Sequence, residues 1–219
     1  MLVSTGIHQI RSAEERVADE NAALLRAMGI VAIHLLASPG AGKTSLILRT
    51  VERLSPRLRP AVIQGTLSSH TGPSLPDRLD LPVVRVDTGG RPYLDASMVG
   101  AALEELPLAD VDLILIEEIG TLTSPAGRSL GESRLVVISS LPEGEDCPLY
   151  YPEPFIHAHA VVLNKLDLLP HLGFDRPRFH QAVRRLNSEA PIFELSCRTG
   201  EGLEQWEEWI SGQAVPHRD

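Results

Sequence analysis

One short segment constrains the fold of this chain more than any other. Residues 37–44 read Ala-Ser-Pro-Gly-Ala-Gly-Lys-Thr, between an apolar run and an amphipathic pattern, and we refer to them as the phosphate loop. The segment matches G-x-x-x-x-G-K-[ST], except that Ala37 replaces the first glycine. Gly40 and Gly42 let successive backbone N–H groups turn toward phosphate oxygens, and the following helix adds the positive end of its dipole. A glycine-rich turn without a ligand is the alternative.

The chemistry expected of this loop follows from its residue types. Lys43 is expected to reach the β- and γ-phosphates of a nucleotide, which makes it a catalytic candidate, and the Thr44 hydroxyl is expected to ligate Mg²⁺. The nucleotide-binding residues predicted here are Ser38, Pro39, Gly40, Ala41, Gly42, Lys43, Thr44 and Ser45.

Short apolar runs recur along the chain and lack the polar alternation of half-exposed strands, which is typical of strands buried on both faces. They lie at 30–37, 61–63, 83–86, 113–116, 135–138, 161–163 and 192–195. Helical patterns lie at 12–28, 43–54, 95–106, 178–187 and 203–210. This alternation predicts an α/β fold with a mostly parallel sheet covered by helices on both faces. We expect an N-terminal helical extension, residues 1–29, packed on a single nucleotide-binding domain, residues 30–219, with a surface loop at 67–82.

Composition narrows the class of partner. The chain has 219 residues, of which 29 are acidic and 20 are basic, for a net charge of −9. Because nucleic-acid binding needs a basic surface, no nucleic-acid partner is expected. Neither a membrane-spanning apolar stretch nor a signal-peptide pattern is visible, and Cys147 and Cys197 are too few for a disulfide framework. These features favour a cytoplasmic protein without a membrane partner.

A second motif lies far downstream of the phosphate loop. Residues 164–167 read Asn-Lys-Leu-Asp after an apolar run, and they match the N-K-x-D pattern that reads guanine; we refer to them as the base loop. Asp167 can accept from both N1–H and the N2 amine of guanine, a donor pair that adenine lacks. Lys165 is expected to pack over the base and Asn164 to tether the loop, while Ser196 and Cys197 supply backbone N–H groups to guanine O6. The alternative is an Asp-capped strand exit.

Further segments follow in the order and spacing of the HypB family. They are Val62-Ile63-x-Gly65, Asp87-Thr88-Gly89-Gly90, Leu94-Asp95-Ala96, Ile116-Glu117-x-Ile119-Gly120, Leu130-Gly131-Glu132, Glu143-Gly144-Glu145-Asp146, Tyr151-Pro152, Phe174-Asp175 and Thr199-Gly200-Glu201-Gly202 followed by Trp206. Over residues 10–212 the chain resembles HypB, and segment 143–146 distinguishes it from the related urease and mutase chaperone GTPases. The resemblance implies a SIMIBI-class P-loop G domain that binds GTP and Mg²⁺ and forms a GTP-dependent homodimer.

The function implied by this resemblance is assistance in nickel insertion during [NiFe]-hydrogenase maturation. The implied partners are other hydrogenase maturation proteins or the hydrogenase large subunit. GTP would be hydrolysed to GDP and phosphate. The alternative from another class is a non-hydrolysing GTP-binding scaffold that recruits the maturation machinery without itself carrying metal.

The chain departs from the family at its switch positions. Thr66 stands where the family carries the Asp of a Gly-Asp pair, and a second expected Asp falls on Gly72. Glu117, at the end of an apolar run, is the retained acidic residue, and we assign it a catalytic and second-shell Mg²⁺ role; a carboxylate capping the next loop is the alternative. Its neighbour Glu118 is expected to be solvated. Without the switch carboxylates, hydrolysis is predicted to be slow.

The metal-handling positions depart as well. The family's Cys-His pair, which binds Ni²⁺ or Zn²⁺ between subunits, corresponds here to Pro92 and Tyr93. Family lysines near segment 143–146 correspond to Cys147 and Tyr150, and the chain has neither an N-terminal Cys cluster nor a His-rich tract. We therefore predict no nickel or zinc ligands, with His70 as the strongest stray candidate.

The remaining candidates have plainer interpretations. Asp95 is predicted to cap the helix at 95–106 rather than bind metal. His157 and His159 are placed at the start of a strand as surface residues without a third ligand. Trp206 and Trp209 are predicted to pack in the core and at its rim.

Overall fold

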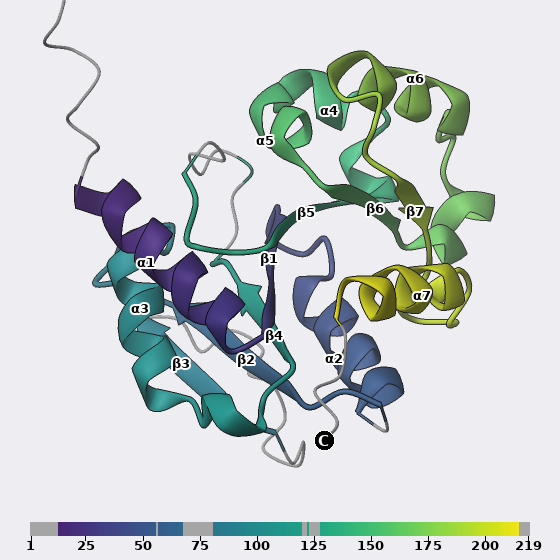
Figure 1. Cartoon of the computed structure of the whole chain (residues 1–219). Helices are drawn as coiled ribbons and strands as arrows, with labels where there is room; N and C mark the ends of the chain where they lie inside the picture. Colours follow the sequence, from purple (N-terminus) through teal and green to yellow (C-terminus); the bar gives the residue numbers. More distant parts are fainter. Residues whose placement is uncertain (1–12, 56, 68–80, 120–121, 123–127, 215–219) are drawn as a thin grey trace, which may run out of the picture.

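The computed structural model describes residues 13–55, 57–67, 81–119, 122 and 128–214. The strands of this part of the chain form one seven-stranded sheet, in the order β3-β2-β4-β1-β5-β6-β7 (Figure 1). The paired strands are all parallel, as the apolar runs predict. The strands are β1 (Val31–Ala37), β2 (Pro60–Thr66), β3 (Val83–Asp87), β4 (Leu113–Glu117), β5 (Arg134–Ser140), β6 (Ala160–Asn164) and β7 (Ile192–Glu194).

Helices cover both faces of this sheet. They are α1 (Ala13–Ala27), α2 (Lys43–Leu54), α3 (Ala96–Glu105), α4 (Cys147–Tyr150), α5 (Pro152–His157), α6 (Arg176–Leu186) and α7 (Leu203–Gln213). Because side chains alternate along a strand, Ile33 of β1 packs toward α2 and α7, whereas Ala32 packs toward α1 and α3. A third apolar cluster joins β5 and β6 to α5 and α6. The predicted α/β fold with helices on both faces is confirmed.

The chain order places the phosphate loop at the middle of the sheet. After β1 the chain builds β2, β3 and β4 on one side, and then crosses to β5, β6 and β7 on the other. In parallel sheets, ligands bind at the carboxyl ends of the strands where the strand order reverses. The loop after β1 lies at this reversal, between the two halves of the sheet (Figure 1).

Several local expectations are wrong, each for a physical reason. β3 and β7 are half-buried rather than buried on both faces, because they are the two edge strands. His157 ends α5 rather than starting a strand, whereas His159 directly precedes β6 and its Nδ1 accepts from the Leu135 N–H at 3.0 Å. Both histidines are exposed, as predicted. The short helices α4 and α5 lack the length that reveals a helical period, and the sequence pattern missed them.

Other local predictions are confirmed. Asp95 caps α3, since its Oδ1 accepts from the Met98 N–H at 2.8 Å. Trp206 is buried and its Nε1 donates to Thr50 Oγ1 at 2.9 Å, while Trp209 is partly buried against the same core. The helix predicted at 12–28 is α1, although its proposed cap Ser12 lies outside the described residues.

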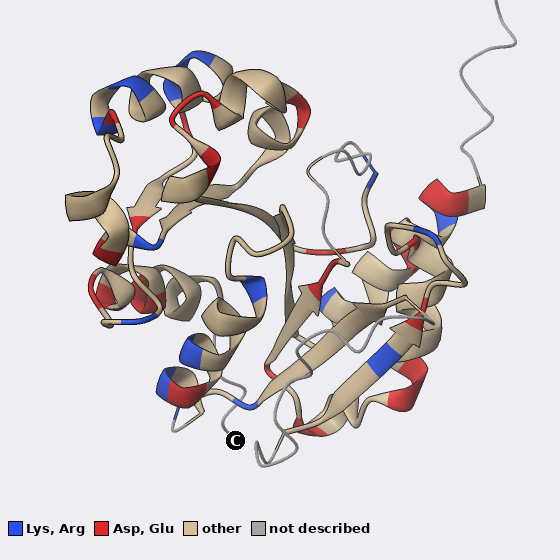
Figure 2. Ribbon diagram, turned by 180° about the vertical axis from the view of Figure 1, so that it is seen from behind, with Lys and Arg blue, Asp and Glu red and all other residues tan. Residues whose placement is uncertain are grey.

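Charge is dispersed over the fold. Figure 2 shows acidic and basic residues interspersed along the helices on both sides of the sheet. None of the helices within the described ranges combines the length and apolarity needed to span a membrane.

Candidate functional site

The phosphate loop has the backbone conformation that its glycines predict. Gly40 and Gly42 have φ angles of +79° and +105°, in the left-handed region that favours glycine. A Cβ at Gly42 would lie 2.3 Å from Asn164 Nδ2, so this position also lacks space for a side chain. Gly42 is the N-cap of α2 and offers no side-chain cap, which leaves the first N–H groups of the helix without a side-chain acceptor. Such an end favours an anionic ligand.

The side chains that follow the loop are buried among polar partners. Lys43 is 8% exposed, and its Nζ donates to the Ala37 carbonyl at 3.1 Å. Burial lowers the pKa of Lys43. The Thr44 hydroxyl donates to Glu117 Oε1 at 2.5 Å, and Gln64 Nε2 donates to Glu117 Oε2 at 2.6 Å. Burial raises the pKa of Glu117, and these two hydrogen bonds oppose that rise. Glu117 therefore lies beside Thr44, and Gln64 is a partner that the sequence did not reveal.

The base loop is tied directly to the phosphate loop. Asn164, the last residue of β6, donates from Nδ2 to the Ala41 carbonyl at 2.9 Å. Its Oδ1 accepts from the Lys165 N–H at 2.7 Å and from the Cys197 N–H at 3.3 Å. Asn164 thus connects three segments, as its tethering role predicts. Lys165 has φ +68°, the one left-handed residue other than glycine among the described residues.

Asp167 is fixed by residues after β7. Its Oδ1 accepts from the Ser196 hydroxyl at 2.6 Å, and Arg198 Nη1 lies 3.5 Å from its Oδ2. The hydrogen bond from Ser196 lowers the pKa of Asp167, and Arg198 contributes in the same direction. Ser196 therefore orients the carboxylate through its side chain. The Ser196 and Cys197 N–H groups were both predicted to face guanine O6. In this structure the first donates to the Glu201 carbonyl at 2.9 Å and the second to Asn164 Oδ1.

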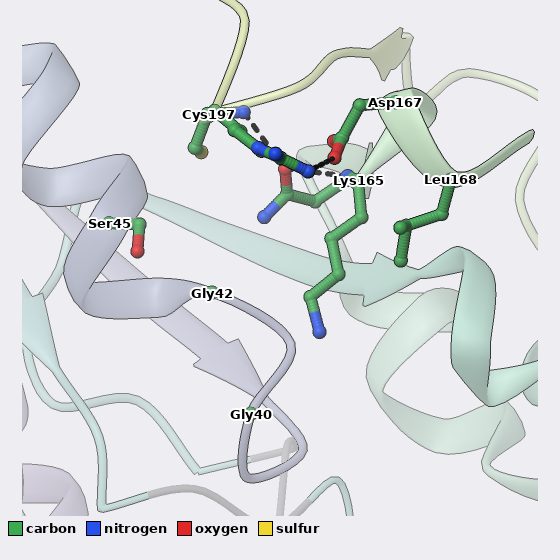
Figure 3. A pocket seen from close by; sticks show the side chains of 9 residues that line it. Gly40, Gly42, Ser45, Lys165, Asp167, Leu168 and Cys197 are labelled. Carbon is green, nitrogen blue, oxygen red and sulfur yellow. Dashed lines mark hydrogen bonds and ion pairs between the residues drawn. The ribbon is translucent and has the colours of Figure 1, made fainter.

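These two loops and the segment after β7 line an open pocket of about 310 Å³ (Figure 3). In Figure 3 the Lys165 side chain extends from the base loop toward the phosphate loop. The lining residues are Gly40, Gly42, Ser45, Asn164, Lys165, Asp167, Leu168, Cys197 and Arg198. Leu168 and Arg198 were not predicted, although each follows a predicted residue directly. Arg49 was also missed; its Nε donates to the Cys197 carbonyl at 2.8 Å and supports the pocket from α2.

The expectation that Glu118 is solvated is wrong. Glu118 is 3% exposed, and its Oε2 lies 2.7 Å from Nε2 of His34, which is itself 5% exposed. His34 Nδ1 lies 3.6 Å from Oε1 of Glu132. We refer to these three residues as the His34 cluster. Burial by itself lowers the pKa of His34, but the two carboxylates outweigh it and raise the pKa to about 10. Glu118 is therefore buried because a charged partner is buried beside it.

The divergent positions make other contacts. The Thr66 hydroxyl donates to the Val86 carbonyl at 3.2 Å, within the sheet. Tyr93 lies under the Arg128 guanidinium, 5.6 Å from the ring centroid. Cys147 is buried, and burial raises its pKa to about 11. His70 and Gly72 lie outside the described residues. Over the residues that the structure places, no three His, Cys, Asp or Glu side chains form a group able to hold a metal ion.

Sequence comparison relates this chain to a defined family. The model for the CobW/HypB/UreG nucleotide-binding domain matches residues 31–194. Hydrogenase maturation factor HypB of Azotobacter vinelandii is 42% identical over 199 residues, which cover 91% of this chain and 66% of that protein. HypB of Escherichia coli (strain K12) is 38% identical over 198 residues, covering 90% of this chain and 68% of that protein. This chain thus spans about two thirds of the length of these relatives.

Solved structures give the same relationship. The crystal structure of hydrogenase maturation factor HypB from Archaeoglobus fulgidus has a TM-score of 0.84 and 33% identity, and the match covers 91% of this chain and 97% of that chain. The crystal structure of HypB from Helicobacter pylori in complex with nickel has a TM-score of 0.84 and 27% identity, covering 95% of this chain and 100% of that chain.

Proposed function

Because the chain belongs to the HypB family, within the wider CobW/HypB/UreG group, we propose that it binds and slowly hydrolyses GTP while assisting nickel insertion into [NiFe]-hydrogenase. The observation that carries the nucleotide part is the pocket between the two loops, joined by the bond from Asn164 to the Ala41 carbonyl. A pocket with a helix N-terminus at one end and a fixed carboxylate at the other suits a purine nucleoside triphosphate.

Selection of guanine over adenine follows from Asp167. An aspartate carboxylate is ionised at neutral pH, and the Ser196 hydroxyl and Arg198 lower the pKa of Asp167 further. An ionised carboxylate only accepts hydrogen bonds, so it matches the two donors on the Watson–Crick edge of guanine. Against adenine it would be desolvated without those partners. GTP is therefore the proposed nucleotide.

The phosphate end offers the groups that phosphoryl transfer requires. Lys43 turns from the Ala37 carbonyl to the β- and γ-phosphates, and the N–H groups of the loop bind the same oxygens. Thr44 and Glu117 present hydroxyl and carboxylate oxygens side by side, a donor set that fits Mg²⁺. Magnesium, when bound, neutralises charge that develops on the phosphate oxygens. Thr44 would hold the ion directly, and Glu117 would act in its second shell.

Slow turnover is proposed from the switch positions. Thr66 bonds to Val86 within the sheet and carries no carboxylate to place a water molecule. Misplacement of an attacking group costs on the order of 100-fold in rate. We expect hydrolysis to be slower than in relatives that have carboxylates at both switch positions. Equal turnover in a matched assay would contradict this expectation and show that another residue places the water.

The nickel part of the proposal rests on the relatives. The named relatives are hydrogenase maturation factors, and one solved relative is in complex with nickel. Here Pro92 has no ligand atom, and the phenol of Tyr93 is a poor ligand near neutral pH. We propose that the chain assists maturation together with partner proteins and as a GTP-dependent homodimer, without tight nickel binding at positions 92 and 93. About one nickel ion retained per dimer against a moderate chelator would contradict this, and Cys147→Ser would test whether that residue holds it.

The sequence offers a direct test of the nucleotide site. The chain has only two lysines, Lys43 and Lys165, and both belong to the two loops. An amine-selective reagent followed by peptide mass spectrometry therefore reports on this site, apart from the chain's α-amine. GTP with Mg²⁺ is expected to protect both lysines, whereas ATP at the same concentration is not. Equal protection by ATP would refute the guanine assignment.

Phosphate release under the same conditions separates the enzyme from the alternative. Slow release of phosphate supports the GTPase. Protection by GTP without any turnover would favour a non-hydrolysing scaffold. Co-purification from the native cell would identify the maturation partner.

A further inference from the structure

Two neighbouring carboxylates at the end of β4 face opposite sides of the sheet. Glu117 is the last residue of β4 and Glu118 follows it, and consecutive side chains along an extended chain alternate in direction. Glu117 contacts Thr44 on the phosphate-loop side. Glu118 contacts His34 and the backbone of Leu94 on the other side. The end of β4 thus contacts the phosphate loop through Glu117, and His34 and Leu94 through Glu118.

Glu118 is held by both of its oxygens. Oε2 lies 2.7 Å from His34 Nε2, and Oε1 accepts from the Leu94 N–H at 2.6 Å. Glu132, the third member of the His34 cluster, accepts from the Leu130 N–H at 2.6 Å and makes no bond to Leu94. Because removing His34 would leave two buried carboxylates without a cation, the position of Glu118 beside it is strongly constrained. Through its hydrogen bond to the Leu94 N–H, Glu118 also holds the loop that contains Leu94.

The loop in question, residues 88–95, connects β3 to α3. At its start, the Thr88 N–H donates to the Thr66 carbonyl at the end of β2, at 3.0 Å. The Thr88 hydroxyl donates to the Arg91 carbonyl at 2.7 Å. At its end, Leu94 packs against Gly65, where a Cβ would lie 3.2 Å from Leu94 Cγ. The loop is therefore attached to the ends of both β2 and β4, and the attachment to β4 is Glu118.

We propose that Glu118 is a positioning residue that links the nucleotide-facing end of β4 to the loop 88–95. The inference rests on the proposed function, because nucleotide and Mg²⁺ would take the Thr44 hydroxyl away from Glu117. Glu117 must then find a new arrangement, and it shares a peptide bond with Glu118. Because Glu118 Oε1 accepts from the Leu94 N–H, a shift of the β4 end is expected to change this hydrogen bond. Nucleotide occupancy is thereby communicated from the phosphate loop to the other face of the sheet.

Amide hydrogen exchange at Leu94 tests this link in the full chain, with and without GTP and Mg²⁺. In the wild type, nucleotide is expected to change the Leu94 exchange rate by about fivefold or more. Glu118→Leu removes the acceptor and is expected to speed exchange without nucleotide by about tenfold, the scale of a lost charged hydrogen bond. The same variant is expected to lose the response to nucleotide. GTP affinity, measured by calorimetry, should stay within about threefold of wild type.

Two further variants keep the test decisive. Glu132→Gln changes the other carboxylate beside His34 but does not touch Leu94, so its loop should respond as in the wild type. Glu118→Gln retains a neutral acceptor and serves if the leucine variant folds poorly; about threefold faster exchange and a reduced response are expected. A full nucleotide response in Glu118→Leu, or in Glu118→Gln where that variant is the one that folds, would overturn the link. Normal GTP binding with an unresponsive wild-type loop would overturn the link alone, whereas absence of GTP binding would overturn the proposed function as well.

Discussion

The nucleotide pocket and the His34 cluster both place ionisable side chains inside the fold, but they arrange them in opposite ways. At the nucleotide site, Asn164 and Lys43 donate to backbone carbonyls and Asp167 accepts from a hydroxyl. Asn164 and Asp167 line the cavity of about 310 Å³, and Lys43 belongs to the phosphate loop. In the cluster, His34 and Glu118 are held mainly by each other and by an adjacent carboxylate. The first arrangement leaves charge to be matched by a ligand. In the second, the imidazolium of His34 offsets part of the charge of two buried carboxylates.

This difference separates two kinds of mutational effect. Changes in the pocket are expected to alter nucleotide binding while leaving the unfolding free energy nearly unchanged. Changes in the cluster are expected to lower the unfolding free energy, because a buried charge left without a partner is costly. If changes in the pocket and in the His34 cluster lowered the unfolding free energy equally, this distinction between the two regions would be wrong.

The largest effect is expected on nucleotide preference, from Asp167→Asn. The amide retains one acceptor and places a donor against guanine N–H groups, so GTP should bind less well and xanthosine triphosphate better. Losing a buried hydrogen-bonded match costs on the order of 10⁴-fold in selectivity. Competition calorimetry with the two nucleotides measures the ratio. Asp175→Asn, which changes the cap of α6 outside the pocket, is the control and should leave the preference intact.

The next largest effect is expected on the unfolding free energy, from a change in the His34 cluster. His34→Leu leaves Glu118 and Glu132 buried without a cation and is expected to cost about 3 kcal/mol of unfolding free energy. His180 supplies the matched control, since it also lies 2.7 Å from a carboxylate, Glu194, but its side chain is 40% exposed. His180→Leu should cost less than about 1 kcal/mol. Urea unfolding measures both, and equal costs would show that burial does not decide the value of such a pair.

The pH dependence of the unfolding free energy tests the ion pair between Glu132 and His34. Burial alone raises the pKa of Glu132, but its contact with the His34 imidazolium outweighs this and lowers the pKa to about 2. The ordinary value is 4.5, so the stabilisation is present above pH 4.5 and is lost as the pH falls toward 2. Wild type should exceed Glu132→Gln by up to about 3 kcal/mol at neutral pH, and the difference should shrink below pH 4.5. A constant difference across this range would contradict the ion pair.

His34, the partner of Glu132, loses its contribution to the unfolding free energy as the pH rises rather than as it falls. The pKa of His34 is raised from 6.5 to about 10, so its contribution is complete below pH 6.5 and declines as the pH rises toward 10. An exposed carboxylate variant, Glu104→Gln, is the control for both limbs and should change stability by less than about 0.5 kcal/mol.

Lys43→Ala is expected to weaken GTP binding. Losing one charge-assisted contact from a preorganised loop should cost at least about 2 kcal/mol of GTP affinity. The unfolding free energy should change little, because Lys43 makes one hydrogen bond, to Ala37, within the described part of the chain. Calorimetry of the variant measures the affinity. If GTP binds as tightly as to the wild type, the loop does not hold phosphate.

Much of the fold and most of the pocket lining were predictable because their signals are contiguous. The phosphate loop requires glycine where φ is positive, and the base loop follows a buried strand, so both requirements are met within a few residues. Each apolar run became a strand for the same reason. Sequence proximity did not indicate which strands lie at an edge, and β3 and β7 were therefore expected to be more buried than they are.

By itself, the sequence determined the α/β alternation, the phosphate loop and the base loop, because backbone conformation and short-range spacing are local properties. Only the tertiary structure decided the environment of the charged residues. Glu118 follows Glu117 directly, yet its partner His34 lies 84 positions away along the chain. Ser196 and Asp167 are separated by 29 positions and meet only because β6 and β7 are neighbours. Burial and charge pairing depend on which distant segments pack together, and that is a property of the folded sheet rather than of any one segment.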